Sequence, residues 1–298
     1  MAKILANDGI AKAAEEELIA LGHEVDTNKY EGDELLKKIA EVDAIVVRSA
    51  TKLRDPQIDA GAAGNLKLII RGGVGVDNIN VDYAREKGIV VRNTPAASSS
   101  AVAELVLGHM LSMARHIGEA NRTMREGQWL KKQYAGTEIA GKTLGLIGFG
   151  RIARSLAQKC LCLGMDVIYT DILDIESDTC CQCGMEEVLK RADYVSVHVP
   201  FSGGEPLIGR DEIAMMKDGV FIINAARGGV IDEDALVDAI EAGKVRGAAL
   251  DVYIEEPLKN ERVRNCDLIS LTPHIGAATA EAQGRIGDEI VAIVKEVL

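Results

Sequence analysis

Short apolar runs alternate with amphipathic stretches along the first third of the chain, and this alternation predicts strands separated by helices. The apolar runs are KILAND (3–8), AIVVRS (44–49), LKLIIRG (66–72) and IVVRNTP (89–95). In the stretch 10–22, Ile10, Ala14 and Leu18 share one helical face, and Gly22 ends the pattern. Runs that are apolar on both faces are typical of parallel strands with helices on both sides of the sheet.

A helical pattern at 98–126, opened by the capping residues Ser98–Ser100, interrupts this series. A second series of apolar runs then follows at 142–150, 166–171, 194–200, 220–226, 247–252 and 267–273. The stretch Thr279–Leu298 reads as one amphipathic helix. Because the long helix breaks the repeat, two doubly wound parallel α/β sheets fit the pattern better than one barrel.

Composition and charge restrict the class of protein. The chain has 298 residues, 47% of them hydrophobic and 27% charged, which suffices for two ordinary globular domains. A formal net charge of −12 argues against a nucleic-acid or anionic-membrane surface. With no leader pattern and no apolar run near ~18 residues, we expect a soluble cytoplasmic protein with no membrane span.

The six cysteines do not form the pattern of a disulfide framework. The segment CCQCG (180–184) contains a C-x-x-C from Cys180 to Cys183, a spacing that zinc sites and redox pairs also use. No second pair stands at a structural-zinc spacing nearby, so we expect a reduced surface loop and no metal.

The segment KTLGLIGFGRIARSLA predicts a strand, a glycine turn and a helix. Gly148 allows the tight turn, Gly150 lets the backbone approach a diphosphate, and Ala153 allows close packing of helix and strand. Free N–H groups at the helix N-terminus would bind the diphosphate. Asp171 ends the next strand, where a carboxylate holds ribose hydroxyls and repels a 2′-phosphate. The pattern therefore predicts NAD as the cofactor.

Three later strands are each followed by side chains that could bind a substrate or transfer a proton. Arg227 follows the first, Asp251 and Glu256 follow the second, and His274 follows the third. Each has an ordinary alternative as a surface arginine, a solvated acid or a turn residue. Together they suit hydride transfer, with His274 as acid–base, Glu256 fixing its imidazole, and Arg227 clamping a substrate carboxylate.

The ordered set of motifs resembles the D-isomer-specific 2-hydroxyacid dehydrogenase family over essentially the whole chain. The motifs are RGGVGVDNIN, GLIGFGRIA, NAARGGVIDEDALVDAI, GAALDVY with EEP, and TPHIGAATAEAQ. The resemblance places the catalytic set on Arg227, Glu256 and His274. It places cofactor contacts on Val74, Gly148, Gly150, Arg151, Ile152, Asp171, Val199, Ala225, Ala226, Asp251, Gly276 and Ala277.

The resemblance also implies a domain organisation. A flavodoxin-like substrate domain would comprise 1–92 and 278–298, and a Rossmann-type NAD domain, 93–277, would be inserted into it. Hinges would fall near Asn93–Pro95 and Gly276–Ala278. The family dimerises through the long helix of the NAD domain, so a homodimer is expected.

Within the family, segments 46–53 and 69–79 resemble the branch that acts on a phosphorylated hydroxy acid. The implied substrate is a small anionic 2-hydroxy acid, 3-phospho-D-glycerate, bound by Arg48, Ser49, Arg71, Gly72, Gly73, Arg227 and His274. Longer relatives carry regulatory domains beyond the last helix, so we expect no feedback inhibition by serine.

Two alternatives remain open. Reduction of hydroxypyruvate, glyoxylate or another 2-oxo acid would use the same catalytic set, and Val74 replaces a hydroxyl side chain of some relatives. A formate dehydrogenase is disfavoured, because that branch carries Gln at the position of Glu256. An NAD-sensing scaffold resembling the corepressor branch would bind the cofactor without turnover.

Overall fold

The computed structural model describes residues 1–201 and 203–298, and these divide into two compact units. Unit 1 comprises Met1–Ser99 and Ala277–Leu298, and unit 2 comprises Ser100–Gly276. Every strand pairing in both units is parallel, which confirms the predicted class of two parallel α/β sheets. Among the described residues, no helix is both long and apolar enough to cross a membrane.

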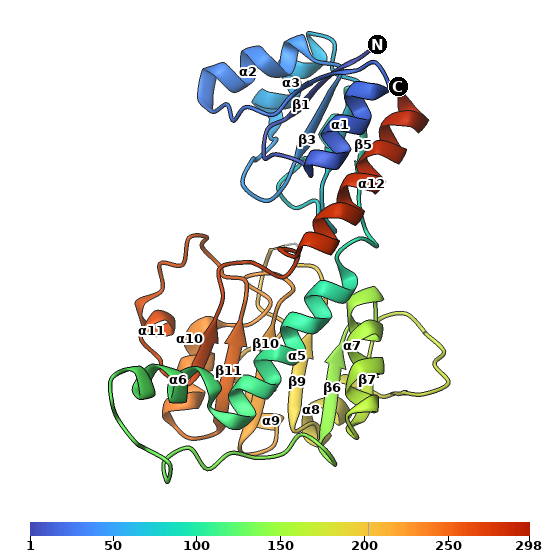
Figure 1. The fold of residues 1–298 in the computed structure, drawn as a ribbon. Coiled ribbons are helices and arrows are strands. Elements are labelled where there is room, and N and C mark those ends of the chain that lie inside the picture. Colours follow the sequence, from blue (N-terminus) through green and yellow to red (C-terminus); the bar gives the residue numbers. More distant parts are fainter. Residues whose placement is uncertain (202) are drawn as a thin grey trace. The chain divides into compact units, whose positions relative to one another are not determined.

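Unit 1 is a five-stranded sheet with helices on both faces, in the order β2-β1-β3-β4-β5. Its strands are β1 (Lys3–Ala6), β2 (Glu24–Asp26), β3 (Ala44–Val47), β4 (Leu68–Arg71) and β5 (Val90–Asn93). Its helices are α1 (Lys12–Ala20), α2 (Gly32–Glu41), α3 (Asp55–Ala62), α4 (Val81–Glu86) and α12 (Ala280–Val297). The last helix, red in Figure 1, lies beside α1 although almost the whole chain separates them.

Alternate residues of each central strand of unit 1 enter different cores. Ile4, Val46 and Ile70 pack against α1 and α12, whereas Leu5 and Ile45 pack on the opposite face against α2 and α3. This period of two explains why the strands read as unbroken apolar runs. The edge strand β2 was not predicted, because three partly exposed residues give no such signal.

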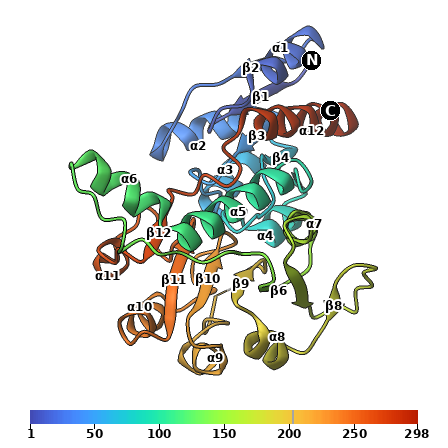
Figure 2. The ribbon, with the colours of Figure 1, turned by 60° about the horizontal axis from the view of Figure 1, so that its bottom comes forward.

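Unit 2 is a seven-stranded sheet in the order β12-β11-β10-β9-β6-β7-β8, covered by helices on both faces (Figure 2). Its strands are β6 (Thr143–Ile147), β7 (Asp166–Thr170), β8 (Cys181–Gln182), β9 (Tyr194–Val197), β10 (Val220–Asn224), β11 (Val245–Leu250) and β12 (Ile269–Leu271). Its helices are α5 (Ser99–Arg115), α6 (Ile117–Arg125), α7 (Arg151–Cys162), α8 (Met185–Arg191), α9 (Arg210–Met215), α10 (Glu233–Glu241) and α11 (Glu261–Arg264). The strand order reverses between β6 and β9, and open α/β sheets bind ligands at such a reversal.

Two details of unit 2 differ from the sequence prediction. The helix expected at 98–126 is two helices, because His116 adopts a left-handed backbone conformation with φ 54° between α5 and α6. The segment expected to be a surface loop contributes the short edge strand β8, and Cys180 beside it is buried. Among the described residues, no group of three or more His, Cys, Asp or Glu side chains is placed to hold a metal ion.

Candidate active site

Arg227 lies in the turn after β10, and the side chain of Asn224 braces that turn. Asn224 is 2% exposed; its Oδ1 accepts from Ala226 N at 3.0 Å, and its Nδ2 donates to Arg227 O at 2.8 Å. The guanidinium Nη1 of Arg227 donates to the carbonyl of Ala226 at 2.5 Å. A short buried amide thus fixes the backbone from which Arg227 extends.

The loop after β10 packs directly against the loop after β11. A Cβ atom on Gly228 would lie 1.8 Å from the carbonyl oxygen of Tyr253, so only glycine fits there. The β11 loop is also held from α10, because the buried Glu233 accepts the N–H of Ile254 at 2.8 Å. These contacts couple the position of Arg227 to that of Glu256, three residues beyond Tyr253.

Glu256 forms a partly exposed ion pair with His274. The Nδ1 of His274 lies 2.8 and 3.0 Å from the two carboxylate oxygens, and the side chains are 33% (His274) and 37% (Glu256) exposed. Burial raises the pKa of Glu256, but the hydrogen bond and charge of His274, the N–H of Tyr253 and the charge of Arg227 outweigh it. The pKa of Glu256 is therefore below its ordinary value of 4.5.

His274 itself adopts a left-handed backbone conformation with φ 53°. This conformation costs a non-glycine residue about 1 kcal/mol, and such strain gathers at functional sites. Because Nδ1 is engaged by Glu256, the other ring nitrogen, Nε2, is left for a substrate. The structure thus brings Arg227, Glu256 and His274 to one edge of the unit 2 sheet, as the sequence predicted.

Asp251 anchors the segment after His274. It is 1% exposed; its Oδ1 accepts from Ile275 N and its Oδ2 from Gly276 N, both at 2.8 Å. The hydroxyl of Thr272 donates to Oδ1 at 2.6 Å. Both carboxylate oxygens are therefore committed to fixing the backbone around the histidine.

The glycine loop between β6 and α7 has the shape that a dinucleotide diphosphate requires. Gly148 has φ 86°, and a Cβ there would lie 2.8 Å from both the carbonyl of His198 and the side chain of Val199. A Cβ on Gly150 would meet nothing within 4 Å among the described residues, so the space in front of the helix is open. No side chain of the described residues caps the N-terminus of α7, which leaves its first N–H groups for an anion.

Asp171 lies beside this loop at the end of β7. Its Oδ2 accepts from Phe149 N at 2.7 Å and its Oδ1 from Leu173 N at 3.0 Å, so the carboxylate is held in place. An ionised carboxylate has about four acceptor positions, and two remain for ribose hydroxyls. The glycine loop and Asp171 therefore fit NAD.

The other predicted cofactor residues are divided between the two units. Unit 2 holds Arg151 and Ile152 in the first turn of α7, Val199 after β9, Ala225 and Ala226 after β10, and the buried Gly276. Unit 1 holds Val74, whose carbonyl accepts from Asn93 Nδ2 at 2.5 Å, and Ala277.

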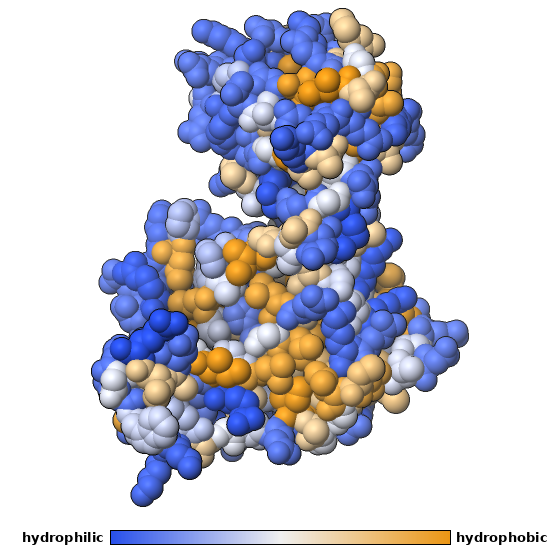
Figure 3. All heavy atoms as spheres, viewed as in Figure 1, coloured by the Kyte–Doolittle hydropathy of each residue, from blue (hydrophilic) through white to orange (hydrophobic). Residues whose placement is uncertain are grey.

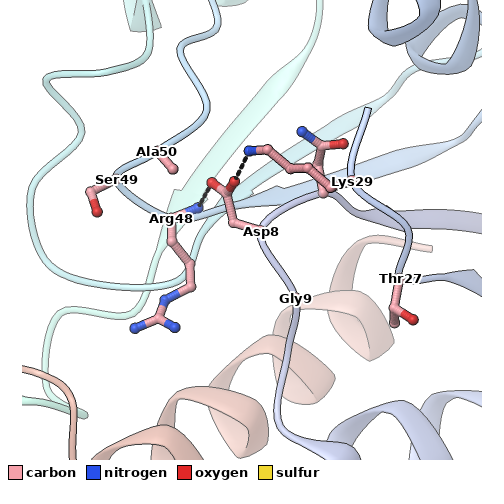
Figure 4. Close-up of a pocket in the computed structure, with 8 residues that line it drawn as sticks. Asp8, Gly9, Thr27, Lys29, Arg48, Ser49 and Ala50 are labelled. Carbon is pink, nitrogen blue, oxygen red and sulfur yellow. Dashed lines mark hydrogen bonds and ion pairs between the residues drawn. The ribbon is translucent and has the colours of Figure 1, made fainter. Parts of the chain in front are cut away.

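A pocket of about 510 Å³ opens at the carboxyl ends of β1 and β3 in unit 1 (Figure 4). Its lining residues are Asn7, Asp8, Gly9, Thr27, Lys29, Arg48, Ser49 and Ala50. Lys29 pairs with Asp8 at 2.5 Å, whereas the guanidinium of Arg48 extends away from that carboxylate. Arg48 forms no side-chain hydrogen bond or ion pair with any residue in 1–201 or 203–298.

Two side chains clamp the loop that carries Arg48 and Ser49. Asp8 accepts the N–H groups of Arg48 at 2.7 Å and Thr51 at 3.0 Å. Asn78 donates its amide to the carbonyls of the same two residues at 2.7 and 2.6 Å. Burial raises the pKa of Asp8, but its bonds to Lys29, Thr51 and these N–H groups leave it below the ordinary value.

Arg71, Gly72 and Gly73 form a separate arrangement at the end of β4. The Nη1 of Arg71 donates to Gly72 O at 3.1 Å, and a Cβ on Gly73 would lie 1.4 Å from that nitrogen. Arg71 thus lies over its own loop, and it is not among the described residues that line the Arg48 pocket.

Sequence reasoning missed the residues that brace these loops. They are Asp8, Lys29, Asn78, Asn224, Gly228, Glu233 and Thr272. Asn78 lies in the motif RGGVGVDNIN and Asn224 in NAARGGVIDEDALVDAI, each in or beside a loop at a strand end. A short polar residue at such a position could have been predicted to brace the loop. Lys29 and Glu233 carry no such signal, because Lys29 stands outside these motifs and Glu233 stands in helix α10, not in a strand-end loop.

Comparison with known proteins agrees with this geometry. Residues 107–276 match the sequence profile of the D-isomer specific 2-hydroxyacid dehydrogenase, NAD binding domain. The hydroxypyruvate reductase of Thermotoga maritima is 47% identical over 97% of this chain and 96% of its own. The D-3-phosphoglycerate dehydrogenase of Methanocaldococcus jannaschii is 43% identical over the whole of this chain, which spans 58% of that relative's length.

The fold is likewise that of a solved dehydrogenase. The NAD-dependent formate dehydrogenase of Staphylococcus aureus, solved in complex with NAD, superposes with a TM-score of 0.88 at 26% identity, over 99% of this chain and 95% of that one. The sequence match covers more than half of the chain and includes the glycine loop, Arg227, Glu256 and His274. The chain belongs to the D-isomer-specific 2-hydroxyacid dehydrogenase family and contains its NAD-binding domain.

Proposed function

We propose that the protein oxidises 3-phospho-D-glycerate to 3-phosphohydroxypyruvate with NAD, a reaction of serine biosynthesis. The observation that carries the reaction type is the His274–Glu256 pair beside Arg227, in which Nδ1 of His274 is bound to Glu256 and Nε2 has no partner among the described residues. The observation that carries the substrate is the pocket in which Lys29 is neutralised and Arg48 is not.

The proton and the carboxylate of the substrate are assigned to unit 2. Nε2 of His274 takes the proton of the C2 hydroxyl as the C2=O double bond forms, and Glu256 stabilises the resulting imidazolium. Arg227 binds the substrate carboxylate through two parallel N–H donors. The Gly148–Gly150 loop and Asp171 would hold NAD, which when bound would supply the acceptor for the hydride that leaves C2.

The choice of NAD over NADP is assigned to Asp171. Its fixed carboxylate would accept ribose hydroxyls, whereas a 2′-phosphate would meet like charge with no described cation paired to Asp171 to offset it.

The phosphate of the substrate is assigned to the pocket of unit 1. Asp8 already accepts four hydrogen bonds, so its negative charge is balanced by Lys29 and by the donors of the loop. Arg48 and the hydroxyl of Ser49 remain to bind a dianion. Each charge-assisted hydrogen bond contributes about 1.5–3 kcal/mol, and an uncharged hydroxymethyl group would gain none of it.

A second candidate is the reduction of hydroxypyruvate. It is favoured by the 47% identity to a hydroxypyruvate reductase over nearly the full length of both chains. This reaction would use the same catalytic set without a phosphate contact.

Steady-state kinetics on four substrates separate the two candidates. We expect kcat/KM to be higher for 3-phosphoglycerate than for D-glycerate, and for phosphohydroxypyruvate than for hydroxypyruvate. Arg48→Ala should lower the two phosphorylated values about 10-fold to 100-fold and leave the others within about twofold. Lys52→Ala is the control, since it removes a cation of the same loop that does not line the pocket. Preference for the unphosphorylated substrates, or equal losses in Arg48→Ala, would support the second candidate.

We also propose that the protein is a homodimer joined through α5 and α6. Figure 3 shows apolar residues gathered on the face of unit 2 where α5 lies. The exposed apolar side chains on or beside these helices are Leu111, Ile117, Met124 and Trp129, which are 37, 54, 52 and 78% exposed. Sedimentation equilibrium should give twice the chain mass of 31.9 kDa, and Ile117→Glu should shift it towards one chain.

A further inference from the structure

A buried polar chain connects helix α5 with the segment that carries His274. His109 lies on α5, is 5% exposed, and has apolar helix neighbours such as Val106, Met110 and Met113. Its Nδ1 lies 2.9 Å from the hydroxyl of Ser270, and its Nε2 lies 3.2 Å from the hydroxyl of Thr272. A buried polar ring is unfavourable unless both nitrogens are satisfied, so these two contacts explain how it is tolerated.

The directions of the hydrogen bonds along this chain follow from the number of protons. The single hydroxyl proton of Thr272 is donated to Asp251 Oδ1 at 2.6 Å, because an ionised carboxylate only accepts. Nε2 of His109 must therefore carry the proton that Thr272 accepts. Burial lowers the pKa of His109, although the charge of Asp251 acts in the opposite sense, so the ring is neutral and its Nδ1 accepts from Ser270.

The chain ends on the carboxylate that fixes the backbone around His274. Asp251 accepts the N–H groups of Ile275 and Gly276, the two residues that follow the left-handed His274. A Cβ on Gly276 would lie 3.1 Å from Asp251 Oδ2, so the carboxylate packs closely against this glycine and a side chain there would crowd it. Losing the donor on Thr272 would remove one of the two hydrogen bonds that Oδ1 accepts, the other being from Ile275 N, and would weaken the hold of Asp251 on the strained turn.

We propose that His109 is a positioning residue for His274, acting through Thr272 and Asp251 on the N–H groups of Ile275 and Gly276. The inference rests on the proposed acid–base role of His274. A residue that only filled the core could be replaced by any side chain of equal volume, whereas this role requires a donor at the Nε2 position.

Two substitutions of His109 separate the effect of its N–H donor from the effect of its side-chain volume. His109→Phe keeps an aromatic ring but removes both polar contacts, and we expect kcat to fall about fivefold with KM within twofold, the size of one neutral hydrogen bond. His109→Gln keeps an amide N–H near the Nε2 position and should recover most of the kcat. Met110→Ala, at the next residue of the same helix and also buried, should lower the melting temperature without changing kcat.

A double-mutant cycle tests the route. If His109 acts through Thr272, then His109→Phe should have no further effect on kcat in a Thr272→Val background. Additive losses, failure of Gln to restore kcat, or an equal fall of kcat in Met110→Ala would each overturn the proposal.

A measurement on the unaltered protein needs no substrate and remains available if the Phe variant does not fold. Nitrogen NMR of histidine-labelled protein should show His109 as the neutral ring protonated on Nε2, and the Phe variant should shift the His274 signals. A neutral His109 with its proton on Nδ1 would refute the proposed hydrogen-bond directions, because Thr272 would then have to donate to Nε2 and not to Asp251. If no hydroxy acid is turned over but these signals are as expected, the proposed function fails and the positioning role stands.

Discussion

Replacing Glu256 with Gln isolates the charge of the proposed catalytic pair, Glu256 and His274, from its shape. Gln is isosteric with Glu, and its amide oxygen can still accept the Nδ1–H of His274 that now lies 2.8 Å from the carboxylate. The N–H of Tyr253, which donates to Glu256 Oε1 at 3.3 Å, can also keep its partner. What disappears is the negative charge beside the imidazolium that forms during oxidation.

The size of the effect follows from Coulomb's law and the exposure of the pair. Opposite charges about 4 Å apart attract by about 4 kcal/mol at an effective dielectric constant near 20 and by about 1 kcal/mol in water. Because the side chains are 33 and 37% exposed, solvent screening places the interaction near the lower limit, at about 1–2 kcal/mol. We therefore expect kcat for oxidation to fall about 5-fold to 30-fold.

The pH dependence gives the sharper assay. Without its charged partner the imidazolium is less stable, so the midpoint of the rising limb for oxidation should move to lower pH by about one unit. The control is Glu255→Gln, which removes the neighbouring charge that pairs with Lys259 on the surface. A midpoint that does not move in Glu256→Gln, or that moves equally in the control, would refute the pairing as the source of catalytic charge stabilisation.

Four further outcomes are expected. Arg227→Lys should lower kcat/KM by 10-fold or more although the charge is kept, because the two parallel donors are lost; full activity would exclude the carboxylate clamp. Asp171→Ser should narrow the ratio of kcat/KM between NAD and NADP, and an unchanged ratio would show that another group selects the cofactor. Gly228→Ala should lower kcat, since its Cβ would lie 1.8 Å from Tyr253 O and must displace one of the two catalytic loops; wild-type rates would contradict that packing. Because the folded pKa of Glu256 is below 4.5, its contribution to stability is complete above that pH and is lost as the pH falls through the folded value, so Glu256→Gln should flatten the acid side of a melting-temperature curve.

The sequence predicted that Arg227, Glu256 and His274 would lie at one edge of the sheet, for a physical reason. Parallel strands all end at the same edge of a sheet, so side chains that follow consecutive strands are brought together without knowledge of any loop. Strands β10, β11 and β12 are neighbours in the sheet, and they deliver Arg227, Glu256 and His274 in that order. The glycine loop was predictable for the same reason, because its strand, turn and helix are contiguous in sequence.

Features that leave no recognisable pattern of apolar and polar residues in the sequence were not predicted. The edge strands β2 and β8 have three and two residues, too few for a period of two to be recognised. The break at His116 depends on one backbone angle, which the helical periodicity of the apolar residues around it does not record. The pocket around Arg48 depends on Lys29, which stands nineteen residues before Arg48 in a different loop of unit 1.

Side-chain length divides the polar residues at the strand ends into two groups. Asp8, Asn224 and Asp251 are short and buried, and each bonds backbone groups of its own or an adjacent loop. Arg48 has a long side chain, and His274 lies on a turn with a left-handed backbone conformation. The polar atoms of both extend beyond the backbone that the short residues brace. A short side chain cannot extend past its loop, whereas a long one can reach a substrate only if that loop is fixed, so each reactive group requires a bracing partner. The order of strands in the sheet decides which short residue lies close enough to brace a given loop. Sequence motifs could therefore indicate the long side chains proposed to contact the substrate, whereas the residues that brace their loops were found only from the fold.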